Sequence, residues 1–295
     1  MLTQVQPTPD TPENRKVFRE FARKSMTWHG LQLLLFVVLL LEESIVSADV
    51  PINGRKQEMS FAREQVQAIA AAAYDRKVKA LARQGKLDRD TALLRRVRRI
   101  AGRVIAQAIL VKPVAANWNW EVHVVSTDRF DAYCMSGGKM LVGSAFLERE
   151  SLSDGELATL LAHEAAHAIA EHVREQLSAV RHLNSAYAHF SAEDVIAVLD
   201  WDLSVSLKLE PLSRLQELEA DDIGIVLAAR AGFDPHAIVS FYRKLANLDR
   251  GKKFFFDTHG AGDEREKVAE AFAAYAEPLY AASFTHGGVP EYVFH

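Results

Sequence analysis

The stretch from Ala162 to Ala168 restricts the possible folds of this chain more than any other, because it reads Ala-His-Glu-Ala-Ala-His-Ala. Two histidines four residues apart share one face of a helix, so the imidazoles of His163 and His167 can converge on one metal ion. Neutral imidazole is a good zinc ligand, and catalytic zinc sites typically combine three protein ligands with a water. Glu164 lies beside the first histidine, where its carboxylate can reach that water without binding the metal. The pattern His-Glu-x-x-His is typical of zinc peptidases.

Chance and a simpler structural role both compete with this interpretation. Random ordering of the 11 histidines and 39 acidic residues among 295 positions would give about 0.05 such patterns. The helix itself is well specified, because Ser153 and Glu156 are a candidate capping box and Asp154 adds negative charge to the first turn. The alternative is a core helix whose histidines only form hydrogen bonds. A third ligand elsewhere in the chain would decide between the two.

The segment that follows Pro211 carries the candidate third ligand. Pro211 can open a helix on which Glu217 and Asp221 share a face. A glutamate completes a two-histidine, one-glutamate zinc site and leaves one position for water, while an acid one turn later can accept an imidazole N–H and fix its tautomer. Glu219 and Asp222 fall on other faces, where we expect them to meet solvent or cap the helix. A charged surface helix is the alternative for the whole segment.

Composition limits the class of protein. With 295 residues, 49% hydrophobic and 25% charged, the chain can form one sizeable core with appendages. A formal net charge of −4 gives no sign of a nucleic-acid partner. The single cysteine, Cys134, excludes an internal disulfide framework, and we expect a buried structural thiol because no basic neighbour in sequence would lower its pKa.

The N-terminal 49 residues have the composition of a leader. A polar and then basic segment precedes an apolar run within residues 28–41, and Glu42 and Glu43 close it. The run is short for a spanning helix, which needs ~17–25 residues, but suits a signal-peptide core, with Val46–Ala48 offering small residues for cleavage. The flanking charges would place the following chain across a membrane. A cleaved signal peptide, an uncleaved membrane anchor, a buried helix and an overlong gene start all fit.

The rest of the chain divides at changes of pattern. From about Gln57 to Lys112 the chain reads as two helices broken at Gly85, and we expect residues 50–112 to form a helical segment packed on the core. The arginine-rich face of the second helix is expected to be solvated, with contact to anionic lipid as the alternative. Residues 113–276 form the expected core, residues 277–295 a tail. Within the core, 118–125, 131–135 and 139–142 have strand character around a turn at residues 136–138, and 175–210 are helical or irregular.

We expect these strands to form a small antiparallel sheet beside the metal helix. An open sheet edge can accept an extended polypeptide as an added strand through main-chain hydrogen bonds. The candidate substrate-binding residues on that edge are Asp131, Ala132, Tyr133, Cys134 and Met135.

These motifs resemble a known family. The pair His163-Glu164-Ala165-Ala166-His167 and Glu217-Leu218-Glu219-Ala220-Asp221 is similar to the zinc metallopeptidase family of CAAX prenyl endopeptidase, HtpX, BepA and LoiP. The segment from Asp131 to Met140 resembles the family's Asn-Ala-Phe-x-x-Pro-Gly-Gly-Lys strand pair, with Asp131 for Asn and Ser136 for Pro. The segment from Phe255 to Arg265 is similar to the family's Ser-Thr-His-Pro-x-x-x-x-Arg element, with Asp257 and Gly260 replacing Ser and Pro. The resemblance covers roughly residues 121–273.

The resemblance implies roles for individual residues. His163, His167 and Glu217 would bind one Zn²⁺ per chain, and Glu164 would be the general base. Asp221 would orient His163. Two further residues come from the third element: His259 would lie near the site, stabilising the oxyanion or capping the zinc in a resting form, and Arg265 would support that loop. Glycine at 260 constrains the loop less than the family's proline would.

Together these patterns predict an α+β, mainly helical protein with a zincin-type metalloprotease core. The predicted function is zinc-dependent hydrolysis of peptide bonds in extended or misfolded polypeptides, and analogy with the family suggests a role in envelope protein quality control. We expect an extracytoplasmic location, in the periplasm or at the outer face of the inner membrane, in preference to a mitochondrial one. We also expect membrane association through residues 28–41. The alternatives are a zinc-binding, chaperone-like or self-inhibited protein, a membrane-tethered helical scaffold, and prenyl-protein processing.

Overall fold

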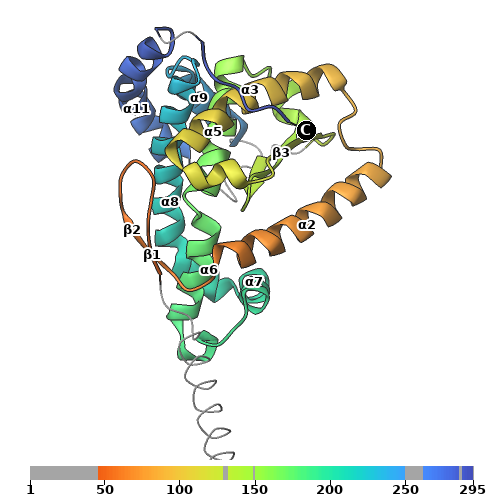
Figure 1. Cartoon of the computed structure of the whole chain (residues 1–295), viewed down its shortest axis with the longest axis vertical. Helices are drawn as coiled ribbons and strands as arrows, with labels where there is room; N and C mark the ends of the chain where they lie inside the picture. The colour runs from red at the N-terminus through yellow and green to blue at the C-terminus, as the bar shows by residue number, and fades with distance from the viewer. Residues whose placement is uncertain (1–45, 129–131, 149, 250–261, 286–287, 295) are drawn as a thin grey trace, which may run out of the picture. The chain divides into compact units, whose positions relative to one another are not determined.

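The computed structural model describes residues 46–128, 132–148, 150–249, 262–285 and 288–294. They belong to one compact unit, Val46–His295. The unit is mainly helical with a small sheet, which confirms the predicted fold class (Figure 1). The helices are α2 (Arg63–Arg83), α3 (Thr91–Val111), η1 (Pro113–Asn117), α4 (Ser144–Glu148), α5 (Asp154–Ile169), α6 (His172–Leu183), η2 (Ser185–Tyr187), α7 (Ala192–Trp201), α8 (Leu203–Arg230), α9 (Ala237–Asp249) and α11 (Gly262–Ser283). The strands are β1 (Val46–Asp49), β2 (Lys56–Met59), β3 (Glu121–Val125), β4 (Ala132–Met135) and β5 (Lys139–Gly143).

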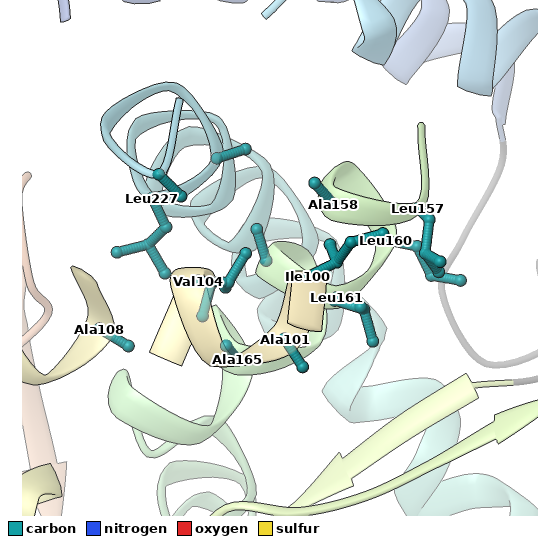
Figure 2. Close-up of a cluster of buried hydrophobic side chains, with 14 of the residues drawn as sticks. Ile100, Ala101, Val104, Ala108, Leu157, Ala158, Leu160, Leu161, Ala165 and Leu227 are labelled. Carbon is teal, nitrogen blue, oxygen red and sulfur yellow. The ribbon is translucent and has the colours of Figure 1, made fainter. Parts of the chain in front are cut away.

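Helix α5, which carries the His-Glu-x-x-His pattern, runs through the centre of the hydrophobic core. Leu157, Leu160, Leu161 and Ala165 are fully buried against apolar side chains of α3 and α8 (Figure 2). Each buried leucine contributes about 1.5–3 kcal/mol to folding. The predicted capping box at Ser153 is present and satisfies the first backbone N–H groups of α5. Because neighbours surround α5, its polar residues are carried into the protein interior.

The arginine-rich face of α3 is partly used in packing, which corrects the expectation of a solvated face. Arg96 and Arg99 pair with Asp154, at 2.7 and 3.1 Å. Arg103 donates to the carbonyl oxygen of Ala231 and stacks over the ring of Phe233. These contacts tie α3 to the start of α5 and to the end of α8.

The three-stranded sheet has the order β3-β5-β4. The expected antiparallel pairing is confirmed for β4 and β5, whereas β3 and β5 are parallel. The reason is that the chain passes from β3 to the far edge and returns as the central strand, so β3 and β5 run in the same direction. The turn at 136–138 is confirmed; Gly138 has a φ of +79° there, and a Cβ would meet the ring of Trp120 at 2.5 Å.

Helix α8 begins at Leu203, eight residues before Pro211, so the expectation that Pro211 opens this helix was wrong. Asp202 supplies the N-cap instead, because its side chain accepts from the backbone N–H of Ser204. A proline inside a helix leaves one backbone carbonyl without its N–H partner. Pro211 is exposed, so water can hydrogen-bond to that carbonyl instead.

Helices α5 and α8 approach closely at Gly224. A Cβ on Gly224 would lie 3.0 Å from the backbone N and 3.1 Å from the Cα of His163. Any larger side chain would therefore push α8 away from the backbone that carries the first histidine. This contact fixes the separation between the histidines of α5 and the acids that precede Gly224 on α8.

The two ends of the unit add contacts that the sequence analysis did not anticipate. Strands β1 and β2 form an antiparallel hairpin, so Val46–Ala48 are strand residues; the leader prediction otherwise concerns residues outside those described. Helix α11 continues past residue 276 to Ser283, and the backbone N–H of Tyr292 donates to the carbonyl oxygen of Gly102. None of the described helices is both long and apolar enough to cross a bilayer. The proposed divisions at residues 49, 112 and 276 stay predictions.

We predict that Gly224→Ala lowers the free energy of unfolding by about 1–2 kcal/mol through overpacking against His163. The sign is informative, because alanine normally stabilises a helix interior by about 1 kcal/mol relative to glycine. Ser206→Ala, an exposed position on the same helix, is the control and should be nearly neutral. Urea unfolding followed by circular dichroism measures both. Stabilisation by Gly224→Ala would contradict the close approach.

Candidate metal centre

The structure brings the two histidines of α5 and one glutamate of α8 together. The Nε2 atoms of His163 and His167 lie 3.0 Å apart. One carboxylate oxygen of Glu217 is 3.3 Å from Nε2 of His163, and the other is 3.4 Å from Nε2 of His167. Among the described residues, these three side chains form a group able to hold a metal ion, with all ligand atoms within 4.8 Å of one another.

The spacing of these atoms fits a tetrahedral ion. Zinc bonds of about 2.0–2.1 Å place neighbouring ligand atoms of a tetrahedron roughly 3.3–3.4 Å apart. The two Glu217 oxygens lie at such distances, 3.3 Å from Nε2 of His163 and 3.4 Å from Nε2 of His167, and the two Nε2 atoms are somewhat closer to each other, at 3.0 Å. Two imidazoles and one carboxylate are also the ligand types that catalytic zinc sites use, with the fourth position left for water. The residues present therefore fit a zinc ion.

The first histidine is held from behind by Asp221. Its Nδ1 lies 2.8 Å from Oδ1 of Asp221, which leaves Nε2 directed toward Glu217. A carboxylate in this position fixes the imidazole tautomer that presents Nε2 to a metal. Asp221 in turn accepts from Arg265 at 2.7 and 2.6 Å and from the hydroxyl of Tyr242. The orientation of His163 is thus set by a buried hydrogen-bond network from α8, α9 and α11.

Arg265 balances part of the negative charge of the carboxylates of Asp221 and Glu217. Its guanidinium, buried to 3% exposure, also donates to Glu217 at 3.2 Å. Burial raises the pKa of Asp221, whereas the positive charge of Arg265 lowers it. The resulting pKa is well below the usual range of an aspartate. Glu217 and Asp221 bring two carboxylates to the cluster, against the one guanidinium of Arg265. A metal cation would offset the remaining negative charge, whose burial is otherwise costly.

The two histidines differ in proton affinity in the metal-free protein. Burial and the charge of Arg265 lower the pKa of His163, but hydrogen bonds to Asp221 and Glu217 outweigh them and raise it to about 9. Burial lowers the pKa of His167 to about 3. A metal ion that binds through Nε2 of His163 must displace any proton held there.

The glutamate of the motif points toward the sheet. Glu164 is buried, and its Oε2 accepts from the backbone N–H of Cys134 at 3.1 Å. Burial raises the pKa of the Cys134 thiol well above its usual value, as expected for a structural cysteine. Strand β4 thus presents a main-chain N–H to Glu164, which connects the metal helix with the outer strand of the sheet.

The predicted site residues divide into three groups. His163, His167, Glu217, Asp221 and Arg265 lie together, and Arg265 binds the acids of α8. Glu164 follows His163 on α5 and contacts Cys134. The expected support of the His259 loop by Arg265 stays a prediction. Ala132–Met135 form β4. His259 and Asp131 lie outside the described residues, so their roles stay predictions.

Glu219 differs from its expected position, and Tyr242 was not predicted as a site residue. Glu219 was expected to face solvent or cap the helix, but it is buried at 3% exposure and binds Arg55 and Asn53. The β1–β2 hairpin supplies these partners. Because the hairpin was not predicted, the burial of Glu219 could not be predicted from the sequence. Tyr242 was also missed, because an aromatic residue in an amphipathic helix is ordinarily a core residue.

Comparison with protein families agrees with this geometry. The model of peptidase family M48 matches residues 92–273. That region contains His163, His167 and Glu217, together with Asp221 and Arg265.

Individual relatives are similar over parts of their length. Mitochondrial metalloendopeptidase OMA1 of Arabidopsis thaliana is 34% identical over 154 residues, 51% of this chain and 31% of the relative. Metalloendopeptidase OMA1, mitochondrial, of Homo sapiens is 28% identical over 257 residues, 81% of this chain and 47% of the relative. Metalloprotease LoiP of Escherichia coli strain K12 is 28% identical over 153 residues, 50% of this chain and 59% of the relative. The chain thus spans less than two thirds of the length of each of these relatives.

We predict that Asp221→Asn weakens zinc binding by about 10–100-fold, because it removes the charge that orients His163 and pairs with Arg265. The neighbouring Asp222→Asn is a matched control, since Asp222 is only half-buried on the same helix. Competition with a chromogenic chelator measures both dissociation constants. Equal zinc affinities for the two variants would show that Asp221 does not orient a ligand.

Proposed function

The chain belongs to peptidase family M48, and on this premise we propose that it is a zinc-dependent metalloendopeptidase that cleaves extended or misfolded polypeptides. The observation that carries the proposal is the convergence of His163, His167 and Glu217 within 4.8 Å, with ligand types and separations that suit zinc. The relatives' names, metalloendopeptidase and metalloprotease, support the same class of reaction.

In this proposal His163, His167 and Glu217 hold one zinc ion per chain. When bound, zinc supplies a Lewis acid that polarises a peptide carbonyl and lowers the pKa of water toward neutrality. Asp221, Arg265 and Tyr242 keep the first histidine and Glu217 in place before substrate arrives, so little reorganisation is needed during the reaction.

Glu164 is the proposed general base. It lies next to His163 on α5 but is not part of the metal-binding group, and its carboxylate is buried beside β4. In that position it can take a proton from the attacking water and pass it to the leaving amine. The backbone N–H of Cys134 holds one oxygen of this carboxylate and so limits its rotation.

The proposed substrate site is β4, one of the two outer strands of the three-stranded sheet. Because the N–H of Cys134 points to Glu164, it is not paired with β5 and faces the side on which catalysis would occur. An extended polypeptide added along β4 would bring its main chain to Glu164 through hydrogen bonds that do not depend on sequence. This favours unfolded or extended segments as substrates.

We propose an extracytoplasmic role in protein quality control, with residues 28–41 as a signal peptide or membrane anchor. The apolar run between basic and acidic flanks supports this assignment, although the run itself lies outside the described residues. The relatives' names include mitochondrial proteins as well as proteins of Escherichia coli, and a mitochondrial location is the alternative to the periplasm. The cellular role rests on analogy with the family.

We predict that Glu164→Gln retains zinc but lowers kcat on an unfolded protein such as reduced, alkylated casein by about 10²–10⁴-fold, because it removes the proton acceptor. Glu148→Gln, an exposed position on α4, is the matched control and should cleave at the wild-type rate. Peptide release is followed by mass spectrometry.

The same assay separates the alternative, a zinc-binding, chaperone-like or self-inhibited protein with little proteolysis. Such a protein would suppress aggregation of the unfolded substrate equally well in the wild type and in Glu164→Gln, and neither would release peptides. That result, with zinc bound in both, would rule out the peptidase.

A further inference from the structure

A third histidine, His172, lies directly behind the second histidine of the motif. Its Nδ1 is 2.9 Å from Nδ1 of His167, and the two rings meet edge to face at 78°. The side chain of His172 is buried, at 1% exposure. The proposed function gives this residue no role.

The backbone places His172 there by interrupting the helix. On a continuous helix, a residue five positions after His167 would point about 140° away from it around the axis. Helix α5 instead ends at Ile169, and Glu171 has a φ of 57°, in the left-handed region that is costly for a residue with a side chain. Helix α6 therefore starts in a new direction, and His172, its first residue, turns back onto His167.

Charged neighbours hold this turn. The carboxylate of Glu171 accepts from Arg63 of α2 at 2.7 Å and from Arg174 of α6 at 2.6 Å. An unfavourable backbone conformation persists when its surroundings fix it from several sides, and such conformations cluster at functional sites. The turn is therefore a built feature of this site.

The hydrogen-bond chemistry assigns a direction to the contact. If Nε2 of His167 faces the metal group, then its neutral ring carries its proton on Nδ1. That N–H must donate to Nδ1 of His172, the atom 2.9 Å away. The proton of a neutral His172 is then on Nε2, which lies 3.4 Å from Oε2 of Glu219 but forms no well-directed hydrogen bond there.

We propose that His172 is a positioning residue for the metal centre: it accepts the Nδ1–H of His167 and so fixes the tautomer and orientation of the second histidine ligand. The proposal rests on the proposed zinc site and extends it. His163 has the carboxylate of Asp221 for this purpose, and His167 has the imidazole of His172. Outer partners of this kind set the geometry and basicity of metal-bound histidines.

His172 does not bind the metal itself in this arrangement. It contacts Nδ1 of His167, whereas the atoms that gather with Glu217 and His163 are on the Nε2 side of the same ring. The ring of His167 therefore separates His172 from the metal group.

The chain of contacts continues to the N-terminal hairpin. Glu219, which faces His172, accepts from Arg55 at 2.6 and 2.8 Å, and Arg55 also binds Glu175 of α6. Arg55 lies in the β1–β2 hairpin, which Figure 1 draws beside α8. Burial raises the pKa of Glu219, but the nearby imidazole of His172 and hydrogen bonds from Arg55 and Asn53 lower it to about 2, so it stays an acceptor near neutral pH. The hairpin thus supports the position of His172.

The test compares two substitutions of His172 in the full-length protein, with zinc alone as the probe. His172→Leu removes the acceptor with a similar volume and should weaken zinc binding about 10–100-fold. His172→Asn keeps an oxygen near the former Nδ1 and should recover most of the affinity. Dissociation constants come from chelator competition, and thermal melting of the metal-free proteins checks folding. If His172 only filled space, His172→Leu would keep at least as much zinc affinity as His172→Asn, because leucine fills the buried space more fully.

A second measurement needs no variant and covers the case in which His172→Leu does not fold. In zinc-bound wild-type protein labelled with ¹⁵N-histidine, the Nδ1–H of His167 should be protected from exchange and show a coupling across the hydrogen bond to Nδ1 of His172. Equal zinc affinity for wild type and a folded His172→Leu, or a His167 Nδ1–H without this coupling, overturns the inference while the zinc site stands. A wild-type protein that binds no zinc, like His163→Ala, overturns the proposed function together with it.

Discussion

The close packing of α8 against α5 is the constraint on which the rest of this structure depends. At Gly224 the two helices meet without an intervening side chain, against the backbone of His163. Two turns earlier on α8, Glu217 reaches the imidazole pair, and between them Asp221 reaches the back of the first ring. The leucines of α5 bury the helix on its other faces, so the separation that suits a metal ion follows from apolar packing.

The polar groups of the site are held by partners that come from several elements. Arg265 and Tyr242, from α11 and α9, converge on Asp221. On the other side of the motif, the left-handed backbone at Glu171 brings His172 behind His167, and Glu219 continues the contacts to Arg55. Each histidine of the pair therefore has its own buried support, and both supports depend on charges that other elements supply.

Local patterns in the sequence predicted the elements that carry the chemistry. Each of these patterns lies within a single helix, so it could be recognised without knowledge of the fold. They are the spacing of His163 and His167, the capping box at Ser153, and the acid pair Glu217 and Asp221. Contacts between distant segments could not: the parallel pairing of β3 and β5, the burial of Glu219 by Arg55 and the role of Tyr242 depend on tertiary packing. The start of α8 was likewise predicted wrongly at Pro211, because the helix begins earlier, where Asp202 caps it.

The most direct test of the central claim is the location of zinc in crystals of the full-length protein, by anomalous scattering above and below the zinc absorption edge. We expect one strong peak per chain, about 2.0–2.2 Å from Nε2 of His163, Nε2 of His167 and a carboxylate oxygen of Glu217. A zinc peak elsewhere in the protein, or protein loaded with zinc that shows no peak between these three side chains, would contradict the account.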